Sequence, residues 1–232
     1  MNLALILLQV PNMVAAADTA AVSEELSLHA YELALKGGWI MYPLAFLLIL
    51  GVYIFFERYF AIKKASKHDA SFMDRIKDKI YAGQIEDAKK LCLDTDTPVS
   101  RMAAKGLSRL GRPLNDINTA IENVGNLEVG RLERGLPIIA SISGGAPMIG
   151  FLGTVIGMIR AFYDMASAGN NIDVTLLSSG IYTAMVTTVA GLVVGIVAYF
   201  AYNYLVARVE RVVYNLESET MVFLDMLNEP GN

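Results

Sequence analysis

Three long stretches of the chain contain no charged residue, and they predict its first structural elements. Asp, Glu, Lys and Arg are absent from residues 37–56, 135–159 and 174–207. An α-helix rises about 1.5 Å per residue, so each stretch is long enough to cross the ~30 Å hydrocarbon core of a bilayer. We therefore expect an all-α membrane protein with three transmembrane helices.

The polar segment between the first two stretches predicts a small helical domain. Phe72, Ile76 and Ile80 recur at helical spacing. Helix-ending residues divide the rest of the segment, and they stand at Gly83, Thr97-Pro98 and Gly111. Pro113 would open a longer helix that leads into the second stretch. The apolar side predicted for that helix consists of Ile117, Ile121, Val124 and Leu127.

The C-terminal segment keeps the apolar residues at helical spacing after the third stretch ends. These residues are Val209, Val212, Val213, Leu216 and Leu224. The transmembrane helices should therefore continue as long helices beyond the membrane. The predicted parts are an N-terminal arm (1–36), transmembrane helix 1 (37–57), a helical loop domain (58–134), transmembrane helix 2 (135–162), a short loop (163–175), transmembrane helix 3 (176–206) and a helical tail (207–232).

Basic residues predict the orientation of these parts. Of the 19 Lys and Arg, 15 lie between Arg58 and Arg134, and two more follow the third stretch. Cytoplasmic flanks collect Lys and Arg. We therefore expect the loop domain and tail to be cytoplasmic, and the arm and short loop to be external. Residues 1–17 form a signal-like segment with a small-residue pattern before Asp18, and both a cleaved leader and an uncleaved arm fit it.

Composition narrows the function classes. The chain is 54% hydrophobic and 18% charged, with a net charge of −4, which disfavours nucleic-acid binding. A single cysteine, without a CxxC or a histidine cluster, provides no ligand set for a metal. The sequence has no nucleophile–base pattern, phosphate loop or HExxH motif. We expect neither an enzyme nor a bound cofactor.

Small residues crowd the second and third stretches and predict close packing of two helices. Gly153 and Gly157 form one GxxxG pattern, and Gly191 and Gly195 form another. Small residues in membranes let helix backbones approach each other. The predicted packing residues are Pro147, Gly150, Gly153, Gly157, Gly191 and Gly195.

Four hydroxyl side chains in the same two helices are the candidate functional residues. They are Thr154, Thr183, Thr187 and Thr188. A threonine can bond the carbonyl one turn earlier in its own helix, so each one alone is also compatible with simple packing. Together, in helices rich in Gly and Ala, they indicate a wettable inner surface. Intramembrane ion relays usually need an ionisable carrier, and the three charge-free stretches offer no such carrier.

Two motifs resemble those of a known family. Residues 146–162 read APMIGFLGTVIGMIRAF, and residues 180–192 read GIYTAMVTTVAGL. These stretches resemble the second and third transmembrane motifs of the MotA/TolQ/ExbB proton-channel family, and the N-terminal arm with the KGGWIMYP stretch resembles the ExbB branch. The resemblance implies a homopentamer in the bacterial inner membrane, whose pore surrounds a dimer of an ExbD-type single-span partner. It also implies that a TonB-like protein passes the work to outer-membrane transport.

The same resemblance assigns roles to single residues. Thr154 and Thr188 match the family's pore threonines, which face the partner's membrane aspartate. Thr183 departs from the pattern, because many relatives carry a glutamate there. Either Thr183 with Thr187 and bound water takes that role, or protons follow another route. Two alternatives stay open: a TolQ-like subunit for envelope integrity, and a non-conducting membrane scaffold.

Overall fold

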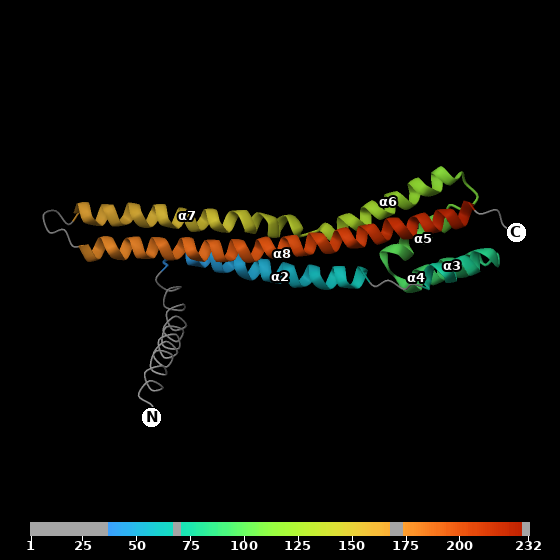
Figure 1. Ribbon diagram of the computed structural model, residues 1–232, viewed down its shortest axis with the longest axis horizontal. Coiled ribbons are helices and arrows are strands. Elements are labelled where there is room, and N and C mark those ends of the chain that lie inside the picture. Colours follow the sequence, from blue (N-terminus) through green and yellow to red (C-terminus); the bar gives the residue numbers. More distant parts are fainter. Residues whose placement is uncertain (1–36, 67–70, 168–173, 229–232) are drawn as a thin grey trace, which may run out of the picture. The chain divides into compact units, whose positions relative to one another are not determined.

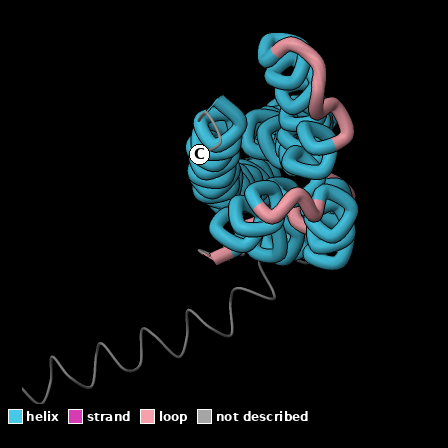
Figure 2. The backbone as a smooth tube through the Cα atoms, turned by 90° about the vertical axis from the view of Figure 1, so that its right-hand side faces the viewer, coloured by secondary structure: helices cyan, strands magenta, loops and turns pink. Residues whose placement is uncertain are grey.

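The computed structural model describes residues 37–66, 71–167 and 174–228. Regular secondary structure within these residues is helical, and Figure 2 draws helices joined by loops and turns there. The predicted all-α fold class is confirmed. The predicted N-terminal arm, residues 1–36, and residues 168–173 of the predicted external loop lie outside the described residues.

Among the residues that the structure describes, three helical segments are long and apolar enough to cross a membrane. The first is α2 (Met41–Ala65), the second contains α7 (Leu136–Ser167), and the third lies in α8 (Val174–Asn228). α8 can be followed in Figure 1 as one orange-to-red helix, and its 55 residues extend far beyond the predicted third span. The protein is a multi-pass membrane protein.

Four shorter helices lie among the described residues of the polar segment, for which the sequence predicts helices. They are α3 (Phe72–Tyr81), α4 (Ile85–Thr95), α5 (Pro98–Leu107) and α6 (Leu114–Glu133). Gly83 and Gly111 have φ of +72° and +88°, a conformation that favours glycine and ends a helix. At the start of α5, the Thr97 hydroxyl accepts from the Ser100 amide at 3.2 Å and the Ser100 hydroxyl accepts from the Thr97 amide at 2.9 Å.

The second transmembrane helix does not continue unbroken into the polar segment, and this differs from the prediction. α6 ends at Glu133, and Gly135 takes a φ of +88° before α7 begins. Arg58 Nη1 donates a hydrogen bond of 3.2 Å to the carbonyl of Arg131, in the last turn of α6. The last carbonyls of a helix have no partner within it, so Arg58 satisfies one of them. The chain therefore turns where Gly135 takes a positive φ and where Arg58 of α2 donates a hydrogen bond to the end of α6.

The described chain divides into two compact units. Counting described residues only, unit 1 comprises those up to Leu48 and those within Ser143–Ile196, and unit 2 comprises those within Ile49–Ile142 and those from Val197 onward. In unit 2, α3 packs on α4, α4 on α5, and α5 on α6. Its core contains Ile76, Leu107, Ile121, Leu205 and Phe223, each at most 2% exposed.

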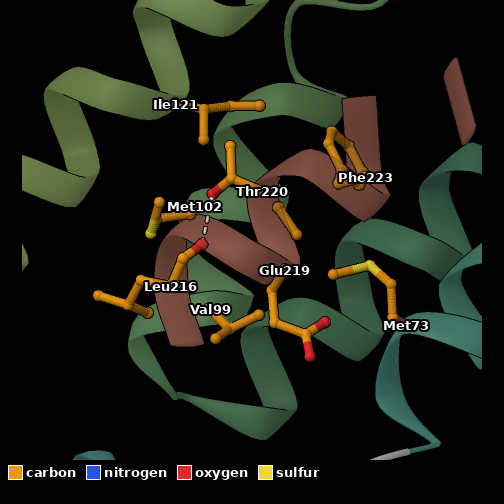
Figure 3. Close-up of a pocket in the computed structure, with 9 residues that line it drawn as sticks. Met73, Val99, Met102, Ile121, Leu216, Glu219, Thr220 and Phe223 are labelled. Atoms are coloured by element: carbon orange, nitrogen blue, oxygen red, sulfur yellow. Dashed lines mark hydrogen bonds between the residues drawn. The ribbon is translucent and has the colours of Figure 1, made fainter. Parts of the chain in front are cut away.

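Gly106 allows the C-terminal part of α8 to join this core. A Cβ at Gly106 would lie 2.5 Å from the Phe223 ring and 2.9 Å from the Ile121 side chain. Figure 3 shows Phe223, Ile121 and Met102 around a small cavity of unit 2, where the Thr220 hydroxyl donates to the Leu216 carbonyl at 2.7 Å. Residues 207–228 of the predicted helical tail are therefore a structural part of unit 2.

The predicted apolar side of α6 is only half right. Ile117 and Ile121 are buried, but Leu127 is 67% exposed. The buried line continues instead through Gly125, Glu128 and Leu132. A Cβ at Gly125 would lie 3.0 Å from the Met102 methyl, so α5 approaches α6 along the glycine rather than along Leu127.

Candidate functional site

The small residues of α7 and α8 face each other in unit 1. A Cβ at Gly150 would lie 2.9 Å from the Thr187 carbonyl oxygen and 3.0 Å from the Gly191 Cα. A Cβ at Gly191 would lie 2.6 Å from the carbonyl oxygen of Ala146 and 2.8 Å from the Gly150 Cα. Real side-chain carbons do not come so close to backbone atoms. At this level the two backbones touch, and only glycine fits on either helix.

The contact extends along both helices. A Cβ at Gly157 would lie 3.0 Å from the Ala184 Cβ, and one at Gly180 would lie 2.5 Å from the Ala161 Cβ. The Gly180–Ala161 pair belongs to the same close contact, although the GxxxG patterns do not include it. An alternation of Gly and Ala across the two motifs is the sequence signal that identifies it.

Pro147 lies inside α7 at one end of this contact. Proline has no amide hydrogen, so the usual helical bond to the carbonyl four residues earlier, at Ser143, cannot form. A Cβ at Gly195 would lie 2.5 Å from Pro147 Cγ and 3.0 Å from the Ser143 oxygen. Because Gly195 has no side chain, the ring of Pro147 can pack directly against α8.

Thr187 and Thr188 both approach α7 from α8. The Thr188 hydroxyl donates a hydrogen bond of 3.2 Å to the Gly150 carbonyl. Thr187 is 1% exposed, and its hydroxyl donates to the Ala184 carbonyl of its own helix at 2.7 Å. A Cβ at Gly153 would lie 2.5 Å from the Thr187 hydroxyl oxygen. Glycine on α7 therefore creates the place in which the Thr187 side chain is buried.

Thr154 and Thr183 are partly exposed. The Thr154 hydroxyl donates to the Phe151 carbonyl of its own helix at 2.6 Å. The structure thus brings Thr187 and Thr188 to the contact between α7 and α8, whereas the hydroxyl of Thr154 bonds within α7. A hydroxyl that donates one hydrogen bond still has lone pairs with which to accept another.

The charged residues of unit 2 form a second cluster that the sequence did not identify. Glu128 is buried in α6, and its two carboxylate oxygens accept from Arg101 Nη2 and from Arg131 Nη1, each at 2.6 Å. Arg101 Nη1 also contacts Asp96 Oδ1 at 2.5 Å. The hydrogen bond to Glu128 is the main reason that the pKa of Arg101 rises above its ordinary value. The cluster ties α5 to α6.

Neither cluster resembles a metal centre. Within residues 37–66, 71–167 and 174–228, no group of three or more His, Cys, Asp and Glu side chains could hold a metal ion. Cys92 is buried in α4, and burial raises the pKa of its thiol to about 11. Such a thiol is protonated at neutral pH and is a poor nucleophile.

Comparison with known proteins gives the family. A model of the MotA/TolQ/ExbB proton channel family matches residues 94–218, more than half of the chain. The chain belongs to the MotA/TolQ/ExbB proton channel family. The matched residues include α6, α7 and most of α8, and thus the glycine contact and all four threonines.

Individual relatives point to the ExbB branch of this family. A protein of Methanothermobacter thermautotrophicus, named as an ExbB homolog, is 28% identical over 187 residues, which cover 80% of this chain and 66% of that protein. A Synechocystis protein named ExbB-like 1 is 32% identical over 181 residues, which cover 75% of this chain and 69% of that protein. The biopolymer transport protein ExbB of Neisseria gonorrhoeae is 30% identical over 156 residues, which cover 61% of this chain and 69% of that protein. The chain thus spans about two thirds of the length of these relatives, and it is an ExbB-type member of the family.

Proposed function

We propose that this chain is a proton-channel subunit that couples the proton-motive force to TonB-dependent transport across the outer membrane, together with an ExbD-type partner. The observation that carries the proposal is the hydroxyl-bearing contact between α7 and α8, in two helices whose apolar stretches contain no ionisable carrier. An ion relay in a membrane usually needs such a carrier. A partner helix with an aspartate supplies it.

The threonines suit contact with an aspartate that changes its charge. A hydroxyl donates to an ionised carboxylate and accepts from a protonated one. In this proposal Thr154 and Thr188 face the partner's aspartate, and Thr183 with Thr187 extends the path. Partial exposure of Thr154, Thr183 and Thr188 in the single chain supports this, because their surfaces are open to another helix.

Several copies of the chain would enclose the partner. Large apolar side chains of α7 and α8 are exposed in the single chain, among them Met148, Phe151, Met185 and Val189, at 61% or more. We propose a homopentamer in which α7 and α8 of each copy line a central pore. One elementary charge that crosses the membrane releases about 2.3 kcal/mol per 100 mV. Work must therefore accumulate over many proton transfers, which small rotations of a pentamer around its partner permit.

The proposed location is the bacterial inner membrane, with the N-terminus periplasmic and the C-terminus cytoplasmic. Arg58, Lys63 and Lys64 follow the first apolar stretch, and Arg208 and Arg211 follow the third. Basic flanks of this kind stay in the cytoplasm. We propose no catalytic role for the chain, since its candidate residues are hydroxyls without a base beside them.

Proton flux into vesicles tests the proposal. The full chain is reconstituted with and without an ExbD-type partner, and wild type is compared with Thr154→Val and Thr188→Val at matched assembly. We expect partner-dependent flux that both substitutions abolish, because valine keeps the shape and removes the hydroxyl. Thr119→Val is the matched control. The Thr119 hydroxyl lies on the exposed side of α6 and donates to the Asn115 carbonyl at 2.9 Å, so the proton flux of this variant should equal that of wild type.

Two results would contradict the proposal. Flux that does not need the partner would mean that the chain conducts by itself. Normal assembly and transport in both valine variants would favour a non-conducting scaffold and leave the threonines a packing role.

A further inference from the structure

A recess between α2 and α8 in unit 2 concentrates positive charge where the apolar stretches end. α2 lines it with Tyr59, Lys63 and Ser66, and α8 lines it with Arg208 and Arg211. Its volume of about 130 Å³ is roughly ten times the ~10–15 Å³ that a cavity needs, on the same measure, to hold one water molecule. The recess therefore has room for a phosphate-sized group.

One wall of the recess is held in place by aromatic packing. Arg208 donates from Nε and Nη2 to the Tyr204 hydroxyl, at 3.2 and 2.8 Å, and its guanidinium lies 5.3 Å from the centre of the Tyr204 ring. The Tyr204 ring stacks on Tyr59, with centroids 6.4 Å apart. These contacts fix the Arg208 side chain before any ligand arrives, which lowers the entropy that binding would cost.

The charge of the recess is not neutralised by neighbouring acids. Within the described part of the chain, no carboxylate forms an ion pair with Lys63, Arg208 or Arg211. Glu57, an acid on the same helix, pairs with Arg58. Three unneutralised cations around one recess repel each other, and an anion between them would remove this cost.

The depth of the recess indicates where that anion comes from. Arg208 is the first charged residue after the stretch 174–207, so the recess lies at the boundary between hydrocarbon and water. Ile62 and Leu205, 3% and 0% exposed, form its apolar floor. Exposed phenylalanines on the same two helices of unit 2, namely Phe56, Phe60 and Phe200, offer apolar surface for acyl chains.

We propose that this recess binds the phosphate of an anionic phospholipid headgroup. Basic pockets between transmembrane helices on the cytoplasmic side of a membrane bind such headgroups. Nε and one Nη2 hydrogen of Arg208 donate to Tyr204, and its Nη1 and remaining Nη2 hydrogens can donate to the phosphate oxygens, while Lys63 and Arg211 add charge. The bound lipid would bridge α2 and α8 at this boundary.

Lipid retention on the purified full chain tests the proposal. The detergent-solubilised protein is stripped of lipid and mixed with equal amounts of phosphatidylglycerol and phosphatidylcholine, and bound lipids are counted by native mass spectrometry. We expect wild type to retain phosphatidylglycerol preferentially. Lys63→Gln and Arg211→Gln should each weaken this retention about fivefold, because each removes a cationic side chain that lines the recess and would contact the phosphate directly.

Matched variants separate a built site from general attraction. Lys64→Gln removes the same charge from the next residue of α2, which does not line the recess. Water and salt screen a charge that does not contact the phosphate, so this variant should retain phosphatidylglycerol within about twofold of wild type. Lys63→Arg keeps the charge and should bind as wild type does. Equal retention of the two lipids, or an equal loss in Lys64→Gln, would overturn the proposal. Displacement of the lipid by millimolar glycerol phosphate would identify a soluble phosphate as the ligand and would also overturn it.

Discussion

The hydroxyl of Thr188 on α8 donates a hydrogen bond to the carbonyl of Gly150 on α7, at 3.2 Å. Glycine at position 150 makes this bond geometrically accessible, because a Cβ there would lie 3.2 Å from the Thr188 Cα. The same hydroxyl is proposed to face a partner's aspartate. It has one hydrogen to donate, so it must exchange the carbonyl for the carboxylate when the latter is ionised.

This exchange predicts different effects of two substitutions on flux and on stability. Thr188→Ser keeps the hydroxyl and should retain most of the partner-dependent proton flux. Thr188→Val should lose the flux while the unfolding free energy falls only slightly, since interhelical hydrogen bonds in membranes average about 0.6 kcal/mol. Flux and the thermal unfolding of the solubilised complex measure the two effects. A parallel loss of flux in Ser and Val variants would show that the methyl packing matters rather than the hydroxyl.

The glycine contact predicts a sharp difference between two Gly→Ala changes on α7. Gly150→Ala would place a methyl group 2.9 Å from the Thr187 carbonyl oxygen, and a backbone atom cannot rotate away. Overpacking of this kind typically costs about 1–3 kcal/mol. We expect a lower unfolding temperature and reduced recovery of the assembled complex. Gly144→Ala is the control: a Cβ there meets nothing within 4 Å, so this variant should be as stable as wild type.

The sequence predicts most of the helices because their signals are local. Gly83, Thr97-Pro98, Gly111 and Pro113 each stand at a helix boundary in the structure. Proline, glycine and hydroxyl caps act on their immediate neighbours, so they can be interpreted without tertiary contacts. The three membrane spans are equally predictable, because the length of each stretch without charged residues is enough to indicate them.

Features that depend on distant contacts were missed. The buried side of α6 passes through Glu128 because Arg101, 27 residues earlier, pairs with it, and no rule of periodicity favours a buried glutamate. At the turn that contains Gly135, Arg58 donates from another helix to a carbonyl at the end of α6, a contact 73 residues apart in the chain that no local pattern shows. At the candidate site, the sequence identified the glycines and threonines as sets, but only the structure shows that Thr187 is buried against Gly153 while Thr188 reaches Gly150.

Burial of Cys92 predicts slow and strongly pH-dependent alkylation. Its pKa of about 11 in the folded protein lies above the ordinary value of 9.0, because burial disfavours the thiolate. The unfolded chain releases the thiol proton at lower pH than the folded chain does. The contribution of the protonated Cys92 thiol to the stability of the fold is therefore fully present below pH 9 and is lost as the pH rises towards 11. We expect iodoacetamide to label the folded protein slowly at pH 8 and the urea-unfolded protein rapidly. Labelling at the same rate in both states would contradict the burial, and Cys92→Ala gives the unlabelled baseline.

The buried carboxylate of Glu128 predicts that α5 and α6 separate when one side chain is shortened. Glu128→Ala removes both 2.6 Å contacts and leaves Arg101, whose side chain is 35% exposed, to be solvated by water. Because water reaches Arg101, the cost should be smaller than for a fully buried pair, and we expect about 1–3 kcal/mol of lost stability. Glu122→Ala on the exposed side of the same helix is the control and should change stability by less than about 0.5 kcal/mol. Hydrogen exchange of α5 amides measures the separation locally. Faster exchange confined to Glu128→Ala is the expected result, whereas unchanged exchange in both variants would mean that the apolar core alone holds the two helices together.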